Sequence, residues 1–132
     1  MEIVVTFPGN KKTSAMVDGF EVRTDQEPSK GGDGTAPSPF ALFLASLASC
    51  SAVYIAFFCQ KRGIPYDKIR VVQRDERDPE TKDVRKISID LELPPDFPGK
   101  YENALLHTVD LCTVKKTIMN PPEFELRAVR RE

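Results

Sequence analysis

Three short stretches in the first part of the chain alternate between apolar and polar residues, which is the pattern of half-buried β-strands. The predicted strands are Ile3–Phe7, Lys12–Val17 and Phe20–Thr24. Asp18-Gly19 separates the second strand from the third and is typical of a two-residue hairpin turn, so these strands are expected to run antiparallel. The following stretch, Pro28–Pro37, is rich in Gly, Pro and Ser and predicts a loop.

A long helix is predicted next. Ser38 suits the N-cap, Pro39 suits the first helical position, and Gly63 suits the position just after the end. Within this helix, Phe40–Cys59 has 20 residues without a charge, which is long enough to cross a membrane. A helix at the centre of a soluble protein can have the same composition, and the amphipathic strands elsewhere need such a core to cover. We therefore expect a buried central helix and no membrane span.

The second half of the chain is predicted to contain a hairpin, a helical region and a last strand, and it shows no internal repeat of the first half. The predicted elements are hairpin strands Lys68–Arg74 and Lys86–Leu93, a helical region Tyr101–Met119 and a last strand Phe124–Val129. Asp78–Glu80 supplies the turn of the hairpin. Together the elements predict an α+β fold in which antiparallel sheets pack on a long buried central helix. The length of the chain fits one domain over residues 1–132.

The charge balance and the residue types narrow the function. The 19 Lys and Arg residues nearly cancel the 20 Asp and Glu residues, so nucleic-acid binding is not expected. The densely charged stretch Arg70–Lys86 mixes both signs and suits a solvated hairpin. One His and three scattered Cys give no ligand spacing for a metal, and no Gly-rich phosphate-binding motif predicts a cofactor.

The beginning of the sequence and its cysteines indicate a compartment. No basic segment followed by an apolar one opens the sequence, so no signal peptide is expected. Three cysteines are an odd number, which argues against a secreted disulfide framework. The expected location is the cytoplasm, where a disulfide is more often catalytic or sensory than structural.

Each cysteine has a structural and a chemical interpretation. Cys50, among small residues in the middle of the long helix, is either an inert buried residue or a thiol that a substrate can approach. Cys112 is either a buried small residue or the start of a new helix, whose N-terminus, with Lys115 and Lys116, would favour its thiolate. Cys59 is expected in the core. It lies nine residues after Cys50, about 13 Å along the helix and on its opposite face, so these two cannot form a disulfide. The sequence leaves open whether Cys50 and Cys112 meet.

Two segments of the chain together resemble a known family. Gly31–Pro39 is a Gly-rich stretch that ends in Pro-Ser-Pro and leads into the Leu- and Ala-rich segment Leu42–Cys50. Leu111–Ile118 contains the second cysteine, ahead of a short predicted helix. In this order, and with the predicted strand order, these segments resemble the osmotically inducible protein C and organic hydroperoxide resistance (OsmC/Ohr) family over nearly the whole chain.

The resemblance implies both a fold and a chemistry. The implied fold is an intertwined homodimer in which sheets from both subunits wrap the central helices. The implied chemistry makes Cys50 the peroxidatic thiol, which becomes a sulfenic acid, and Cys112 the resolving thiol, which condenses with it to a disulfide. An external dithiol would then reduce the disulfide. The chain would be a thiol-dependent peroxidase that reduces organic hydroperoxides in oxidative stress defence.

The chain also departs from the family pattern at sites that matter for this chemistry. Phe40 stands where the organic hydroperoxide resistance branch has a Glu that helps to orient an activating Arg, and Thr113 stands where a Pro often follows the second cysteine. Arg23 is the candidate for the activating cation, and its alternative interpretation is an exposed strand charge. His107 matches no motif position and is expected at a helix surface or interface.

Two other functions remain open on the sequence. A non-enzymatic dimer of the same fold that binds a small apolar ligand is the main alternative, and the absence of the family Glu favours it. A purely structural or interaction domain is the other. If the chain is a peroxidase, apolar walls from Phe40 and Phe43 favour a fatty or aromatic hydroperoxide over a hydrophilic one.

Overall fold

The computed structural model describes residues 1–131, and the chain divides into two compact units, Met1–Ser46 and Leu47–Glu132. The first unit contains β1 (Ile3–Gly9), β2 (Lys12–Val17), β3 (Phe20–Thr24), the 3-10 turn η1 (Pro28–Lys30) and the start of α1 (Pro39–Arg62). The second contains the rest of α1, β4 (Arg70–Arg77), β5 (Val84–Glu92), η2 (Gly99–Tyr101), α2 (Glu102–Val109) and α3 (Thr113–Met119). The predicted α+β class is confirmed.

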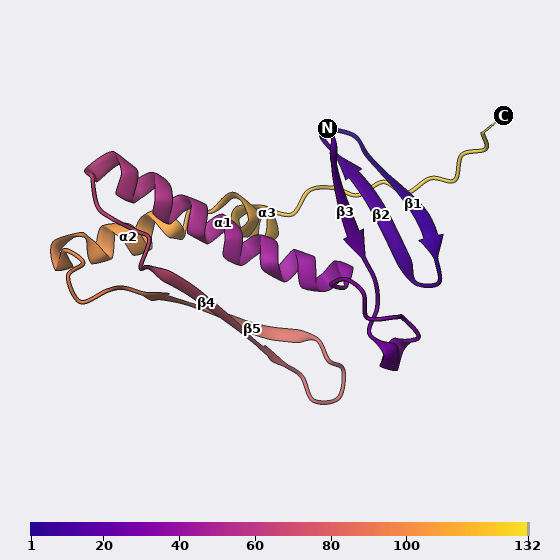
Figure 1. Cartoon of the computed structure of the whole chain (residues 1–132), viewed down its shortest axis with the longest axis horizontal. Coiled ribbons are helices and arrows are strands. Elements are labelled where there is room, and N and C mark those ends of the chain that lie inside the picture. The colour runs from indigo at the N-terminus through magenta and orange to yellow at the C-terminus, as the bar shows by residue number, and fades with distance from the viewer. Residues whose placement is uncertain (132) are drawn as a thin grey trace. The chain divides into compact units, whose positions relative to one another are not determined.

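The strands of the first unit form one antiparallel sheet in the order β1-β2-β3 (Figure 1). Asp18 and Gly19 join β2 to β3 with φ angles of 48° and 84°, both in the left-handed region that a type I′ hairpin turn requires. Val17 and Phe20 pair directly beside this turn. The three predicted strands are therefore confirmed, and β1 runs two residues further than predicted.

The first unit buries almost none of its apolar side chains. Within Met1–Ser46 the buried residues are Thr24 and Asp25, and neither is hydrophobic. The exposed large apolar side chains of its strands are Ile3, Val4, Val5, Phe7, Met16 and Phe20. Phe7 is 84% exposed and Phe20 is 74% exposed, so this sheet has no hydrophobic core of its own.

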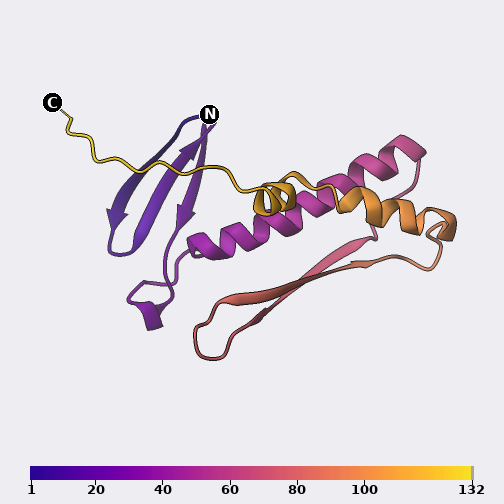
Figure 2. The same ribbon diagram turned by 180° about the vertical axis from the view of Figure 1, so that it is seen from behind.

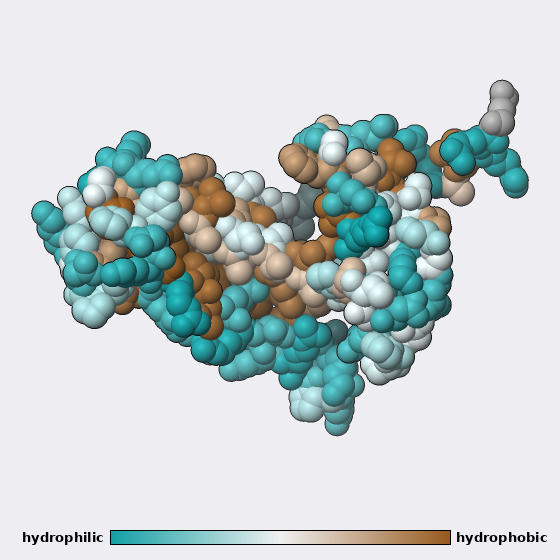
Figure 3. Space-filling view, in the orientation of Figure 1, coloured by the Kyte–Doolittle hydropathy of each residue, from teal (hydrophilic) through white to brown (hydrophobic). Residues whose placement is uncertain are grey.

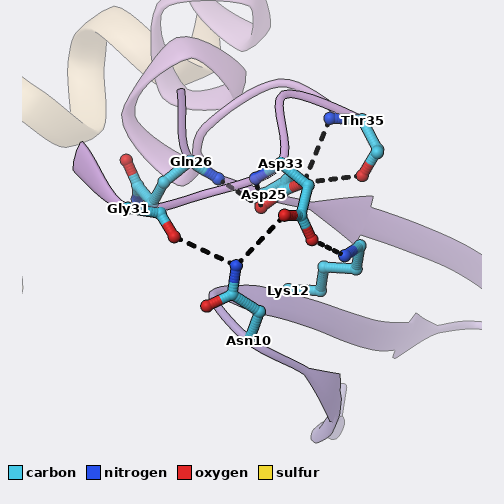
Figure 4. A network of polar contacts seen from close by, with 7 residues as sticks. All are labelled: Asn10, Lys12, Asp25, Gln26, Gly31, Asp33 and Thr35. Carbon is cyan, nitrogen blue, oxygen red and sulfur yellow. Dashed lines mark hydrogen bonds and ion pairs between the residues drawn. The ribbon is translucent and has the colours of Figure 1, made fainter. Parts of the chain in front are cut away.

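Asp25 organises the loop that follows β3. Its buried carboxylate accepts hydrogen bonds from the backbone N–H groups of Gln26 (2.7 Å), Asp33 (3.4 Å) and Thr35 (3.0 Å), and from the Thr35 hydroxyl (2.6 Å) (Figure 4). Lys12 from β2 pairs with the Asp33 carboxylate at the same loop. These contacts fix the Gly-rich stretch ahead of α1.

The ends of α1 follow from local sequence. The Ser38 hydroxyl accepts a hydrogen bond from the Ala41 N–H at 3.2 Å, as the N-cap prediction requires. At the other end Gly63 adopts a φ of 64°, and the Ile64 N–H donates to the Cys59 carbonyl at 3.0 Å. The predicted start and end of this helix are confirmed.

The core of the second unit lies between α1, α2 and the β4–β5 hairpin (Figures 1 and 2). Its buried residues are Ile55, Phe58, Cys59, Ile64, Leu105 and Val109. Val71 of β4 and Leu91 of β5 pack against this cluster. The alternation predicted for the second hairpin strand is confirmed, because Ile87, Ile89 and Leu91 are half-buried while their charged neighbours are exposed.

Only one stripe of α1 is buried. It consists of Leu47, Ser51, Ile55, Phe58 and Cys59, whereas Val53 (46%) and Phe57 (59%) are among the exposed apolar side chains of the same helix. Within the part of the chain that the structure describes, α1 is the one helix that is long and apolar enough to cross a membrane, judged by length and composition alone. Burial of the whole helix therefore stays a prediction.

The predicted helical region Tyr101–Met119 is broken in two. Between α2 and α3 the backbone turns at Asp110–Cys112, and Cys112 is the N-cap of α3 with φ −52° and ψ 135°. The Cys112 sulfur accepts a hydrogen bond from the Lys115 N–H at 3.4 Å. A cysteine can replace the usual Ser or Asp here because its sulfur is also an acceptor.

The predicted last strand, Phe124–Val129, is wrong for the single chain. Residues 121–131 form no helix or strand. Phe124 (89%), Leu126 (100%) and Val129 (80%) are almost fully exposed. The alternating pattern is present, but a strand also needs a partner for its backbone hydrogen bonds, and this chain provides none for these residues.

Candidate active site

The structure places both candidate thiols in the second unit. Cys50 is half-buried in the middle of α1, and Cys112 is fully buried at the start of α3. The two side chains lie close enough that each shifts the pKa of the other, although 62 positions separate them in the sequence. Both cysteines are free thiols in the structure. The site is therefore a reduced dithiol that joins two helices.

The surroundings of Cys50 favour its ionised form. Burial alone would raise the pKa of this thiol, but three hydrogen bonds to the sulfur outweigh it and hold the pKa below its ordinary value. They come, in order of effect, from the Val114 backbone N–H, the Cys112 side chain and the Thr113 backbone N–H. The first turn of α3 is thus directed at Cys50.

The surroundings of Cys112 favour its neutral form, in contrast to those of Cys50. Burial raises the pKa of its thiol, and the neighbouring Cys50 raises it further, which outweighs the hydrogen bond from the Lys115 N–H. The sequence-based expectation that a helix N-terminus and two lysines favour the Cys112 thiolate is therefore wrong. The Thr113 N–H lowers the pKa of Cys50 alone and the Val114 N–H acts on both thiols, while the Lys115 ammonium is paired with Asp110.

A hydrogen bond beside the dithiol was not anticipated from the sequence. The hydroxyl groups of Tyr54 and Thr113 lie 3.0 Å apart. Tyr54 follows Cys50 by four residues on α1, and Thr113 follows Cys112 directly, so this bond makes a second link between the same two helices. The i, i+4 spacing of Cys50 and Tyr54 was visible in the sequence, but the approach of α3 was not.

A groove of about 590 Å³ lies within the second unit, and neither Cys50 nor Cys112 is among its lining residues. Its lining includes Ser51, which follows Cys50, and Lys115 of α3. The apolar part of the lining comes from Leu47, Ile87, Ile89, Leu106, Ile118 and Met119. Such a groove suits a small ligand with an apolar body.

The other predicted residues fall at separate places. Arg23 lies on β3 in the first unit, where its Nε donates to the Glu21 carboxylate at 2.9 Å. The Phe40 ring packs on the Phe43 ring with centroids 5.6 Å apart.

Cys59 is fully buried, and burial raises the pKa of its thiol, which confirms it as a core residue. His107 is exposed on α2, as expected. Among residues 1–131 no group of three His, Cys, Asp or Glu side chains could hold a metal ion.

The fold is α+β, and two free cysteines come together from α1 and the start of α3. The OsmC family model, described as OsmC-like protein, matches residues 32–127. The chain belongs to the OsmC-like protein family. The fold of this family is that of a soluble domain. A comparison with curated protein sequences gave no match.

Solved structures share the fold. A Psychrobacter arcticus 273-4 protein, whose name assigns it to osmotic stress and detoxification responses, is 25% identical with a TM-score of 0.75, covering 87% of this chain and 85% of its own. An OsmC-like protein from Mycoplasma pneumoniae is 17% identical with a TM-score of 0.71, covering 91% and 87%. The organic hydroperoxide resistance protein OhrB of Bacillus subtilis is 18% identical with a TM-score of 0.54, covering 92% and 93%.

Proposed function

We propose that this protein is a thiol-dependent peroxidase that reduces organic hydroperoxides through Cys50 and Cys112. The observation that carries the proposal is the contact between the two thiols, together with the opposite displacement of their pKa values. A peroxidatic thiol must be ionised to attack, whereas a resolving thiol is needed only after the attack. The arrangement supports Cys50 in the first role and Cys112 in the second.

The proposed reaction consists of two steps in the protein. The Cys50 thiolate attacks one oxygen of the hydroperoxide, the O–O bond breaks, and an alkoxide leaves and takes a proton from solvent to become an alcohol. Cys50 is then a sulfenic acid. The Cys112 sulfur attacks the Cys50 sulfur, the S–O bond breaks, and water leaves as the disulfide forms. An external dithiol reduces the disulfide by exchange and becomes oxidised itself.

The choice of an organic hydroperoxide has two supports. The groove beside Ser51 has a mainly apolar lining, which suits the carbon chain or ring of such a substrate. The structural relatives from Bacillus subtilis and Legionella pneumophila are named for organic hydroperoxide resistance. Arg23 stays our candidate for a further activating cation, in addition to the N–H groups of Thr113 and Val114.

The proposed active form is a cytoplasmic homodimer. The uncharged face of α1 and the coreless β1–β3 sheet leave large apolar side chains exposed in a single chain, and apolar surface is visible as brown patches in Figure 3. A second copy of the chain would cover such surfaces from water, as the family resemblance implies. The cytoplasm would keep both thiols reduced between turnovers.

The test is to treat the reduced protein with one equivalent of cumene hydroperoxide and then to measure intact mass and map peptides without reduction. We expect rapid loss of two hydrogen atoms and a bridge between Cys50 and Cys112. Cys50→Ser should abolish turnover, and Cys112→Ser should stop at a Cys50 sulfenic acid that a sulfenic-acid probe captures. Cys59→Ala is the matched control and should still form the bridge, because Cys59 lies in the core away from the pair.

Two outcomes would count against the peroxidase. Retained turnover in Cys50→Ser would remove Cys50 from the reaction. Unchanged thiols in the wild-type protein would instead favour a non-enzymatic dimer that holds a small apolar ligand, because the mainly apolar groove of the second unit fits that function as well.

A further inference from the structure

The N–H groups that face Cys50 belong to a short helix that could shift relative to α1. Thr113 and Val114 are the first two residues of α3, which has seven residues, none of them buried. Few packing contacts therefore fix α3, and a hydrogen bond to a sulfur atom weakens steeply when its angle changes. Something other than core packing must hold these two donors in place.

The Tyr54–Thr113 bond is in the right position to do so. Tyr54 packs against the core cluster of the second unit and makes an edge contact with the Phe57 ring, with centroids 6.0 Å apart. Its ring is therefore held, and its hydroxyl is a fixed point on α1. The 3.0 Å bond from this point reaches Thr113, the residue whose own N–H faces Cys50.

Residue 113 could be a proline without harm to the backbone. Proline is favoured at the first position of a helix, and Cys112, with φ −52° and ψ 135°, has the conformation that a residue before proline prefers. A proline would lack both the N–H and the hydroxyl. Thr113 supplies both, and in this structure both are used toward α1.

We propose that Tyr54 and Thr113 are positioning residues, whose hydroxyl–hydroxyl bond ties the first residue of α3 to α1 and so sets the position of the first turn of α3 relative to Cys50. The inference rests on the proposed function for its catalytic meaning, since it specifies how the peroxidatic thiol is activated.

The other groups near Cys50 do not take over the role of the Tyr54–Thr113 hydrogen bond. Cys112 donates one hydrogen bond to the Cys50 sulfur, but Cys112 is itself carried by the same turn before α3. Lys115, the first cation along α3, is paired with Asp110. The two backbone N–H groups therefore depend on the position of α3, and Tyr54 is the side chain of α1 that contacts its first residue.

The test measures ionisation of Cys50 without any peroxide. Reduced protein is alkylated with iodoacetamide over a range of pH, and peptide mapping separates Cys50 from Cys59 and Cys112. Tyr54→Phe and Thr113→Val should each raise the pKa of Cys50 by roughly half to one pH unit, which slows its alkylation near neutral pH about 3- to 10-fold. The double variant should equal either single variant, because both remove the same bond.

Thr113→Pro tests the backbone donor as well as the hydroxyl. It should raise the pKa of Cys50 more than Thr113→Val does, while the helix-start position keeps the fold intact. Matched controls are Tyr66→Phe, whose hydroxyl accepts from Gln60, and Thr108→Val on α2, whose hydroxyl donates to the Ala104 carbonyl. Both controls should leave the ionisation of Cys50 unchanged.

The inference fails if Tyr54→Phe and Thr113→Val leave the pKa of Cys50 where it is, or if their effects add in the double variant. Thermal melting of each variant separates this result from loss of fold. The proposed function fails by a different result. In that case the wild-type protein has a low Cys50 pKa but does not react with cumene hydroperoxide.

Discussion

The two thiols of the site differ by what surrounds each sulfur atom. Cys50 is half-buried and receives N–H groups from α3, whereas Cys112 is fully buried and caps that helix. The sequence identified both cysteines and anticipated a helix start at Cys112. It could not show which sulfur the N–H groups affect, because that depends on the approach of Cys50, which lies 62 positions before Cys112.

Asp25 is a second residue with strongly altered ionisation, and sequence analysis did not single it out. Hydrogen bonds from the Thr35 hydroxyl, and then from the N–H groups of Thr35, Gln26 and Asp33, hold the pKa of its carboxyl far below the ordinary value, against the effect of burial. A lowered pKa in the folded state means that the ionised carboxylate stabilises the fold above the ordinary aspartate pKa of 3.8, and that this contribution is lost as pH falls through the folded-state pKa.

Asp25→Asn should therefore lower the melting temperature at neutral pH, and its difference from the wild type should shrink as pH falls below 3.8. The amide keeps the size of the side chain but replaces one acceptor oxygen with a donor. Thermal melts at several pH values measure the effect, with Asp67→Asn at an exposed position as the control. A difference that is constant over the whole pH range would show that ionisation of Asp25 is not involved.

At the scale of elements, local signals decided what the sequence could predict. Caps and turns fixed the ends of α1 and the hairpin turn at Asp18-Gly19, because these conformations depend on neighbouring residues alone. The segment Phe124–Val129 was predicted as a strand on the same kind of pattern and failed. Its residues do alternate, but a strand also needs a neighbouring strand to pair with, and the alternation of one segment does not show whether such a neighbour exists.

The loop between β3 and α1 makes an element-scale prediction through Gly32. A Cβ atom added at Gly32 would lie 1.9 Å from the Gln26 carbonyl oxygen, which is backbone and cannot move aside. Gly32→Ala should therefore lower the free energy of unfolding by about 2 kcal/mol or more.

Gly99→Ala is the matched control, because a Cβ at Gly99 meets nothing within 4 Å. It should change the free energy of unfolding by less than about 0.5 kcal/mol. Urea denaturation measures both variants. Equal stability of the two would mean that the loop at Gly32 adapts to a side chain, contrary to the geometry described.

At the scale of the whole molecule, the first unit buries no hydrophobic residue, while α1 exposes apolar side chains along its uncharged stretch. The absence of charge in Phe40–Cys59 already indicated that this helix must be shielded from water on most of its surface. Composition alone could not separate a lipid environment from a protein one. Membership of the OsmC-like family, whose fold is that of a soluble domain, favours a protein environment.

The proposed homodimer predicts that Phe57→Arg weakens self-association. Phe57 is 59% exposed on α1, and its burial by a partner would contribute about 1.5 to 3 kcal/mol. The dimer dissociation constant should rise at least about tenfold, as measured by sedimentation equilibrium. Glu80→Arg introduces the same side chain in the exposed turn between β4 and β5 and should not change association. A wild-type protein that is monomeric at micromolar concentration would contradict the proposed dimer.

The contact between Cys50 and Cys112 also has a consequence for the topology of the chain. A bond between these sulfur atoms encloses β4, β5 and α2 in a covalent ring of about 60 residues, and it removes conformational freedom mainly from the unfolded chain. The entropy of closing such a ring corresponds to about 4 kcal/mol in favour of the folded state. The oxidised protein would then resist unfolding and proteolysis better than the reduced one. In the proposed cycle, the disulfide form accumulates when peroxide is abundant and reductant is scarce, so the protein would be most stable under those conditions.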